Sequence, residues 1–422
     1  MIEINEFNTA LFRAAVAKMP LPNIERMLAF PETVTTTDDR TESGYLEPWV
    51  QWVSVHTGAP ASEHKIKNLG DVPNLEHKQI WETLGTRGVT SGIWGVMNGG
   101  MRDAKNCRFF LPDPWTFSEQ GFPAELNGLL DLPRYLSKNY LVLSKQAISL
   151  KTARLLWFLV SSGAVLDFLA ELPRLIASCL QFGPKHFVFI CFFDCLSTRI
   201  FLRYKLRFTP AFSLIFLNSI AHLQHHYWTE GTEHLTSPLR FGLAAMDRIM
   251  GMLFDNAGEG DGLIILNALS QMNTNHEAPW ILFRQKDPAA FLRTVKIPFE
   301  RVEQMMTNDA HVFFESAELC RSAVKALAAA SIDGRPAFHV EADEKNPLKL
   351  FYRVDFTDPV TDGTQILVNG RDLKFLDVFE SIVIRTGRHV PTASLFARGV
   401  DVPPKMKNHE LNKILVAHFS HA

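Results

Sequence analysis

The sequence predicts an α/β protein, because short strand-like segments alternate with helical ones along the chain. Apolar runs of strand length recur at residues 91–96, 211–217 and 262–266, and longer segments with helical spacing separate them. Parallel strands need long crossover connections, which are usually helices, so the alternation favours a mostly parallel central sheet with helices on both faces. Ligands of such sheets bind beyond the carboxyl ends of the strands.

The first part of the chain alternates between strands and helices. In chain order we expect a strand at 1–4, a helix at 11–19, a further segment at 24–30, an exposed loop at 33–43, an apolar segment at 46–55, a helix at 78–84 and a strand at 91–96. Pro20 and Pro22 mark a break before the segment 24–30 because proline interrupts helical hydrogen bonding. The loop is predicted from its Thr and acidic side chains, which are typical of exposed connections.

Two segments depart from this alternation, and we expect both to be insertions. Residues 117–208 are long, apolar and helically periodic, which predicts a mainly helical insertion. Residues 287–377 mix helix and strand signals and are expected to form a second, α+β insertion. The α/β core then comprises residues 1–116, 209–286 and 378–422. Its later elements are expected to be a strand at 211–217, helices at 218–228 and 246–254, a strand at 262–266 and a polar loop at 267–277.

Composition is that of a folded globular protein. The 422 residues are 46% hydrophobic and 21% charged, which is enough apolar material for a large core. The net charge of -2 lacks the basic excess that attracts polyanions, so we expect no nucleic-acid partner. Five scattered cysteines favour free thiols in a reducing compartment. The acidic N-terminus is unlike a signal peptide, and no apolar run is long enough to span a membrane, so a cytoplasmic location is expected.

Three groups of ionisable residues are candidates for chemistry. His222, His225 and His226 follow a predicted strand, and imidazoles serve as metal ligands or proton carriers. His389 lies in a basic, glycine-containing segment suited to an anionic group. Glu47 lies beside tryptophans, where burial would raise a carboxyl pKa. Taken singly, each group also has a structural explanation as a packed histidine, a basic loop or a strand-end carboxylate.

Four segments in one order carry a family resemblance. Residues 52–66 (WVSVHTGAPASEHKI) are similar to W-x-S-x-x-T-G-x-x-P-x-x-H-G-I, and residues 221–228 (AHLQHHYW) are similar to D-H-x-Q-H-x-[FY]-W. Two further segments match patterns of the same family in the same order. They are the opening strand followed by Leu21-Pro22-Asn23, and the closing segment Gly387-Arg388-His389. These patterns resemble the alkaline phosphatase superfamily, in particular its type I phosphodiesterase and nucleotide pyrophosphatase branch. The resemblance touches nearly the whole chain outside the two expected insertions.

The resemblance implies hydrolysis of phosphate or sulfate esters by a Ser or Thr nucleophile and two metal ions, usually zinc. The hydroxyl nucleophile and the first metal ligand are both replaced in this sequence. The nucleophile position falls on Glu47 or Pro48, neither of which carries a hydroxyl group, and the opening Asp ligand falls on Asn5. Polar residues near the vacant positions are alternatives if the correspondence is shifted: Thr41, Ser43, Gln271, Asn273 and His276.

The metal ligands are also depleted. One Asp position falls on Ala221, and a ligand pair falls on Ala268 and Leu269, whose side chains offer no lone pair. The positions of two His ligands match His225 and His389. We therefore expect no two-metal centre, and either one divalent metal, zinc or manganese, or none.

We expect a rebuilt site in which Glu47, His225 and His389 are catalytic. The two histidines would hold a single metal ion, or all three residues would act without metal as acid, base and nucleophile. The expected substrate-binding residues are Asn5, Glu6, Asn98, Asp113, Asn218, His222 and Arg388. The expected activity is that of a hydrolase or transferase for an anionic small-molecule or glycan ester, or a glycosyl phosphate.

Two other functions remain open at this point. The replaced ligands suit a pseudoenzyme that keeps the fold as a binding or scaffold module. The aromatic, apolar segment 155–202 would suit an enzyme that contacts a membrane surface, although apolar helices more often form core.

Overall fold

The computed structural model describes residues 1–40, 44–141, 143–229, 231, 234–274, 277–305 and 307–420. The chain divides into two compact units. Unit 1 comprises Met1–Arg134, Gln146–Asn275 and Thr386–Ala422, and unit 2 comprises Tyr135–Lys145 and His276–Arg385. In the described part of the chain, no helix has the length and apolarity needed to cross a membrane.

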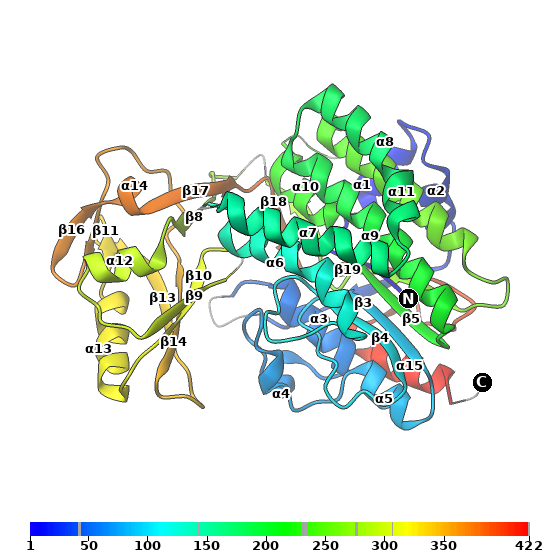
Figure 1. The fold of residues 1–422 in the computed structure, drawn as a ribbon, viewed down its shortest axis with the longest axis horizontal. Helices are drawn as coiled ribbons and strands as arrows, with labels where there is room; N and C mark the ends of the chain where they lie inside the picture. The colour runs from blue at the N-terminus through cyan, green and yellow to red at the C-terminus, as the bar shows by residue number, and fades with distance from the viewer. Residues whose placement is uncertain are drawn as a thin grey trace. The chain divides into compact units, whose positions relative to one another are not determined.

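Unit 1 is built on an eight-stranded sheet with the order β20-β2-β19-β6-β1-β5-β3-β4 among the described residues (Figure 1). The strands are β1 Ile2–Ile4, β2 Glu32–Thr36, β3 Ser91–Val96, β4 Cys107–Pro112, β5 Phe212–Leu217, β6 Leu263–Leu266, β19 Thr392–Arg398 and β20 Lys405–Lys407. Strand β19 is antiparallel to its neighbours β2 and β6, and the other pairings are parallel. The expected α/β class with a mostly parallel sheet is confirmed.

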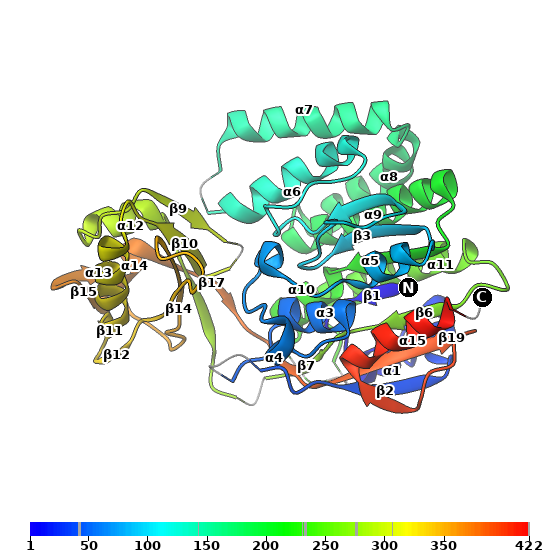
Figure 2. The same ribbon diagram turned by 90° about the horizontal axis from the view of Figure 1, so that it is seen from below.

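Helices cover both faces of this sheet (Figures 1 and 2). Helices α9, α10 and α11 pack together on one face, and α3, α5 and α15 lie on the other. The helices of unit 1 are α1 Thr9–Val16, α2 Pro22–Leu28, α3 Pro48–Thr57, α4 Ala61–His64, α5 Ile80–Thr86, α7 Lys145–Ser161, α8 Val165–Phe182, α9 His186–Phe208, α10 Ser219–Tyr227, α11 Ser237–Asp255 and α15 Leu411–His418, with α6 Asn127–Asn139 at its boundary.

The boundaries of the two units differ from the expected insertions. Most of the helical segment 117–208 belongs to unit 1, because α9 packs directly on β3, β4 and β5. The expected second insertion, 287–377, lies inside unit 2, which begins earlier and ends later.

Two segments that we expected to be loops contain strands. Residues 33–43 were assigned to a loop, but β2 begins at Glu32, and its Thr33 and Thr35 side chains are buried. Residues 267–277 were also assigned to a loop, but β7 (Ser270–Asn273) pairs with β18 (Gly387–Val390). Both expectations were wrong because distant segments supply the strand partners, and β-branched threonine fits a half-buried strand.

Unit 2 consists mainly of antiparallel strands around an aromatic core. Phe283, Phe291 and Phe379 belong to this core and are buried. The elements of unit 2 are β8 Ile281–Gln285, α12 Pro288–Thr294, β9 Arg301–Gln304, β10 Asp309–Phe313, α13 Ala317–Ala328, β11 Ser331–Ile332, β12 Arg335–Pro336, β13 Phe338–Ala342, β14 Lys349–Val354, β15 Gln365–Val368, β16 Arg371–Lys374, α14 Phe375–Val378 and β17 Phe379–Ile384.

Candidate functional site

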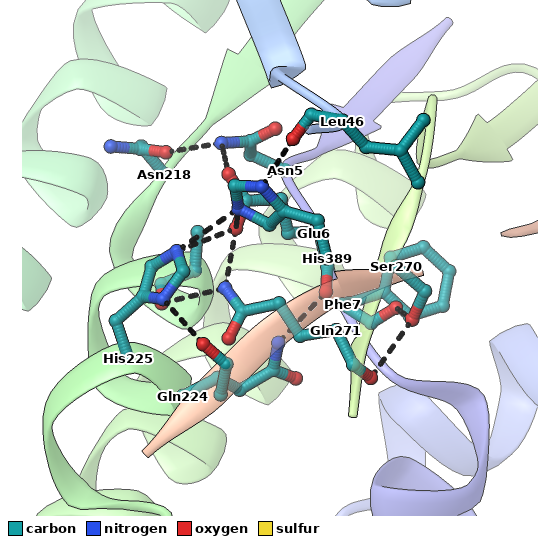
Figure 3. Close-up of polar contacts among 12 residues, drawn as sticks. Asn5, Glu6, Phe7, Leu46, Asn218, Gln224, His225, Ser270, Gln271 and His389 are labelled. Carbon is teal, nitrogen blue, oxygen red and sulfur yellow. Dashed lines mark hydrogen bonds and ion pairs between the residues drawn. The ribbon is translucent and has the colours of Figure 1, made fainter. Parts of the chain in front are cut away.

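Three side chains from distant parts of unit 1 meet where the central strands end. Glu6 follows β1, His225 lies on α10 after β5, and His389 lies in β18 (Figure 3). Strands β1 and β5 are adjacent and parallel, so the residues that follow them lie at the same edge of the sheet. Among the described residues, Glu6, His225 and His389 form a group whose ligand atoms all lie within 4.8 Å of one another.

Both imidazoles point at one carboxylate oxygen. The Oε2 atom of Glu6 lies 2.9 Å from Nε2 of His225 and 3.0 Å from Nε2 of His389. The two Nε2 atoms are 3.3 Å apart. Glu6 is buried, and the two histidines are partly buried. Three potential ligand atoms therefore converge on one small volume.

Backbone carbonyls determine the tautomer of both rings. The Nδ1 atom of His389 lies 2.6 Å from the carbonyl oxygen of Leu46, and Nδ1 of His225 lies 3.3 Å from that of Gly387. A carbonyl oxygen can only accept, so each Nδ1 carries the proton. A neutral ring then presents the lone pair of Nε2 to Glu6, as metal-binding histidines do when a second partner orients them.

This convergence needs positive charge among the three atoms. Two neutral imidazoles would place their lone pairs against each other and against a carboxylate, which is repulsive. Protons on Nε2 or one metal ion would supply that charge. Ligand atoms around one tetrahedral zinc ion lie roughly 3.3 Å apart, so the donor set and its spacing fit a single divalent metal. The shorter N–O distances also suit hydrogen bonds from protonated rings.

The charge of Glu6 is stabilised in place. Burial by itself would raise the pKa of Glu6, but the charges and hydrogen bonds of His389 and His225 outweigh it and hold the pKa well below its usual range. Asn5 donates to Oε1 over 2.9 Å, and Gln271 donates to Oε2. Glu6 is thus an ionised acceptor at neutral pH.

The backbone at Glu6 is strained and anchored. Its φ of 57° lies in the left-handed region that non-glycine residues rarely adopt. The side chain of Gln224 donates to the carbonyl oxygen of Glu6 over 2.7 Å, and Asn267 and Ser270 donate to that of Phe7. These contacts hold the conformation that presents the Glu6 carboxylate to the histidines.

Asn5 links Glu6 to the next strand end. Its Nδ2 also donates to Oδ1 of Asn218 over 2.8 Å, and its Oδ1 accepts from the indole of Trp52 over 2.8 Å. Because the indole N–H can only donate, it determines which end of the Asn5 amide faces Glu6. Asn5 therefore contacts Glu6 directly and Asn218 contacts Asn5, and their expected part in substrate binding stays a prediction.

Glu47 directly follows Leu46, whose carbonyl oxygen contacts His389. It precedes α3 in extended conformation and is half-buried, and the neighbouring Leu46 carbonyl is the acceptor for His389. Its role as a catalytic residue stays a prediction.

Asn98 and Asp113 have contacts that shape loops. Asp113 is buried and accepts from the backbone of Asn98, Trp115 and Thr116 and from the Thr116 hydroxyl. Asn98 accepts from the backbone of Gly70 over 3.0 Å. Their expected part in substrate binding stays a prediction.

Among the described residues, His222 and Arg388 are not members of the three-residue cluster. His222 stacks on His226 and packs against His186 on α9, and burial lowers its pKa to about 3, so the ring stays neutral. Arg388 alternates with His389 along β18, which directs the two side chains to opposite faces of the strand.

Sequence reasoning placed Glu6 among substrate-binding residues, whereas in the structure it is the carboxylate that meets both histidines. The supporting contacts of Gln224, Gln271 and two carbonyl groups were not anticipated. Gln271 had been noted only because it lies near a vacant ligand position. Ala268 and Leu269 are buried and apolar. Thr41, Ser43 and His276 lie outside the described residues.

Comparison with known proteins yields structural similarity at low sequence identity. No family model and no curated protein matches the chain. Phosphonoacetate hydrolase from Sinorhizobium meliloti 1021 in complex with phosphonoformate is 12% identical with a TM-score of 0.42, covering 99% of this chain and 94% of that one. Human ectonucleotide pyrophosphatase/phosphodiesterase 5 is 11% identical with a TM-score of 0.46, covering 100% and 94%. The murine protein of that name is 11% identical with a TM-score of 0.43, covering 99% and 94%.

Proposed function

We propose that this protein is a hydrolase or transferase for an anionic phosphate or sulfate ester, or for a glycosyl phosphate. Its site is the cluster of Glu6, His225 and His389, and Glu47, the residue after Leu46, is a further candidate. The observation that carries the proposal is the convergence of one carboxylate oxygen and two oriented imidazole nitrogens within 4.8 Å. The resemblance of four ordered sequence segments to the alkaline phosphatase superfamily supports the ester class.

The residues of this site can bind charge and move protons. Glu6, His225 and His389 would hold one zinc or manganese ion, and a bound divalent ion would act as a Lewis acid toward an ester oxygen. In a metal-free site, the Nε2 atoms of the histidines would exchange protons with the substrate or with water. Glu47 is the candidate nucleophile or base. The partial positive charge at the start of α3 favours an anionic group beside it.

The first test is metal content. We expect about one zinc or manganese ion per chain in purified wild-type protein, measured by inductively coupled plasma mass spectrometry, consistent with three protein ligands. The double substitution His225→Ala with His389→Ala should abolish binding, and Glu6→Gln should weaken it. His226→Ala is the matched control, since His226 is the adjacent histidine on the same helix.

Activity is tested on phosphodiester, phosphomonoester and sulfate ester substrates. Hydrolysis that is lost in the double variant and in Glu6→Gln, but kept in His226→Ala, would support an enzyme. A protein that binds no metal after incubation with excess zinc and hydrolyses none of these esters would contradict the proposal. That result would favour the pseudoenzyme alternative, which the apolar Ala268 and Leu269 also suit.

A further inference from the structure

Helices α7 and α8 expose apolar side chains that helices of globular proteins usually bury. Trp157 on α7 is 72% exposed, and Leu166 and Leu180 on α8 are 72% and 83% exposed. The α7–α8 apolar surface is defined here as the exposed residues Leu150, Leu156, Trp157, Val160, Leu166, Leu169, Ile176 and Leu180. Exposed apolar side chains concentrated on two consecutive helices mark interaction sites more often than isolated ones do.

The polarity of α8 is reversed relative to an ordinary surface helix. Its two acidic residues face inward: Asp167 pairs with Arg203 over 2.7 Å, and the buried Glu171 pairs with Arg199 over 2.6 Å. Its exposed apolar residues recur at helical spacing and therefore share the outward face: Leu166, Leu169, Ile176 and Leu180. The acidic groups are thus neutralised internally, and leucine and isoleucine side chains are left in contact with solvent.

The charge of this part of the chain indicates the kind of partner. Residues 145–208 contain nine Lys and Arg and three Asp and Glu, and Asp131 and Glu125 pair with Arg154 and Arg207, which leaves an excess of four positive charges in a chain of net charge -2. Helix α7 has no Asp or Glu. Two copies joined through this surface would bring like charges together, whereas an anionic lipid surface would attract them. Exposed tryptophan beside leucine and basic residues is typical of helices that lie at a membrane interface.

We propose that the α7–α8 apolar surface binds the surface of an anionic lipid bilayer, with both helices lying in the interface. This inference is independent of the chemistry proposed for the Glu6, His225 and His389 cluster. It concerns a peripheral contact, because no helix in the described part of the chain can cross a bilayer.

Flotation with lipid vesicles tests the proposal. We expect wild-type protein to float with phosphatidylcholine vesicles that contain about 30 mol% phosphatidylglycerol, and to partition at least tenfold more weakly onto phosphatidylcholine alone. The double substitution Leu166→Ser with Leu180→Ser should weaken binding roughly a hundredfold, because each inserted leucine is worth about a factor of ten. Leu367→Ser, at an exposed leucine of unit 2, is the matched control and should leave flotation unchanged.

A second measurement places α7 at the lipid. Brominated lipids should quench the fluorescence of wild-type protein more than that of Trp157→Phe. Wild-type protein that stays in solution with anionic vesicles would overturn the proposal. A wild-type dimer that becomes a monomer in the Leu166→Ser/Leu180→Ser variant, measured by light scattering, would also overturn it by showing that a second copy covers this surface.

Discussion

At the scale of single residues, the neutral amide of Asn5 supplies a hydrogen-bond donor to the buried carboxylate of Glu6 without adding a second acidic group. Asn5 donates to Glu6 and to Asn218, while Trp52 donates to Asn5. An aspartate at position 5 would place a second acidic group against Glu6 and replace a donor with an acceptor. The side chain at position 5 therefore holds Glu6 without adding charge.

The substitution Asn5→Asp tests this account. In metal-free protein at pH 7 it should lower the free energy of unfolding by about 2–4 kcal/mol, because it buries an unpaired charge beside Glu6. Such burial would raise the pKa of the new carboxyl group, so the loss should shrink below about pH 4, where the group is protonated in both states. Urea unfolding at both pH values measures the effect.

The control for this substitution is Asn74→Asp, at an exposed asparagine, which should change stability little. Equal stability of Asn5→Asp and wild type at pH 7 would contradict the role assigned to the Asn5 amide.

At the scale of elements, the pairing of β7 with β18 brings His389 to the site. Gln271 on β7 lies opposite His389 on β18, and Gly387 lies opposite Asn273. A Cβ atom at Gly387 would lie 2.3 Å from the side-chain oxygen of Gln271 and 3.1 Å from the carbonyl oxygen of Gln224. The absence of a side chain at Gly387 thus leaves room for the glutamine that holds Glu6.

The substitution Gly387→Ala should displace Gln271 and loosen Glu6. We expect a loss of about 1–3 kcal/mol in the free energy of unfolding, which is typical of overpacking, together with reduced metal binding. Calorimetry and metal titration check the two effects. Gly260→Ala is the control, since no atom lies within 4 Å of a Cβ atom there. Unchanged metal affinity in Gly387→Ala would show that Gln271 does not position Glu6.

At the scale of the whole molecule, each unit contains a buried histidine that stays neutral. Burial lowers the pKa of His64 in unit 1 to about 4, and burial together with Lys349 lowers that of His311 in unit 2 to about 3. Both values lie below the ordinary 6.5 of an unfolded chain. Unfolding therefore takes up protons below pH 6.5, and stability is lost as the pH falls from 6.5 toward the folded-state values.

Acid sensitivity follows in both units. Below pH 6.5 each histidine should lower the free energy of unfolding by up to about 1.4 kcal/mol per pH unit. His64→Gln and His311→Gln should each flatten the pH dependence of unfolding, measured in urea between pH 7 and pH 4, whereas the exposed His234→Gln should not. Because burial raises the pKa of Asp194 to about 6 and opposes this trend in unit 1, each variant is compared with wild type at the same pH. Parallel curves for all variants would contradict the prediction.

The sequence by itself determined the elements whose signals are local. The buried strands β3, β5 and β6 follow from apolar runs, which act over a few residues. The motif residues His225 and His389 were also identified as site residues from the sequence. The parallel topology accounts for the position of His225, which follows β5, whereas His389 reaches the site through the antiparallel pairing of β18 with β7.

Tertiary structure decided what depends on contacts between distant segments. Strands β2 and β7 form because β19 and β18 pair with them across more than a hundred residues, and local polarity cannot indicate such a partner. The left-handed backbone of Glu6 turns that carboxylate toward both histidines, and two carbonyl groups orient the rings. Which carboxylate completes the cluster is a matter of three-dimensional position, because Glu6 and Glu47 offer the same functional group.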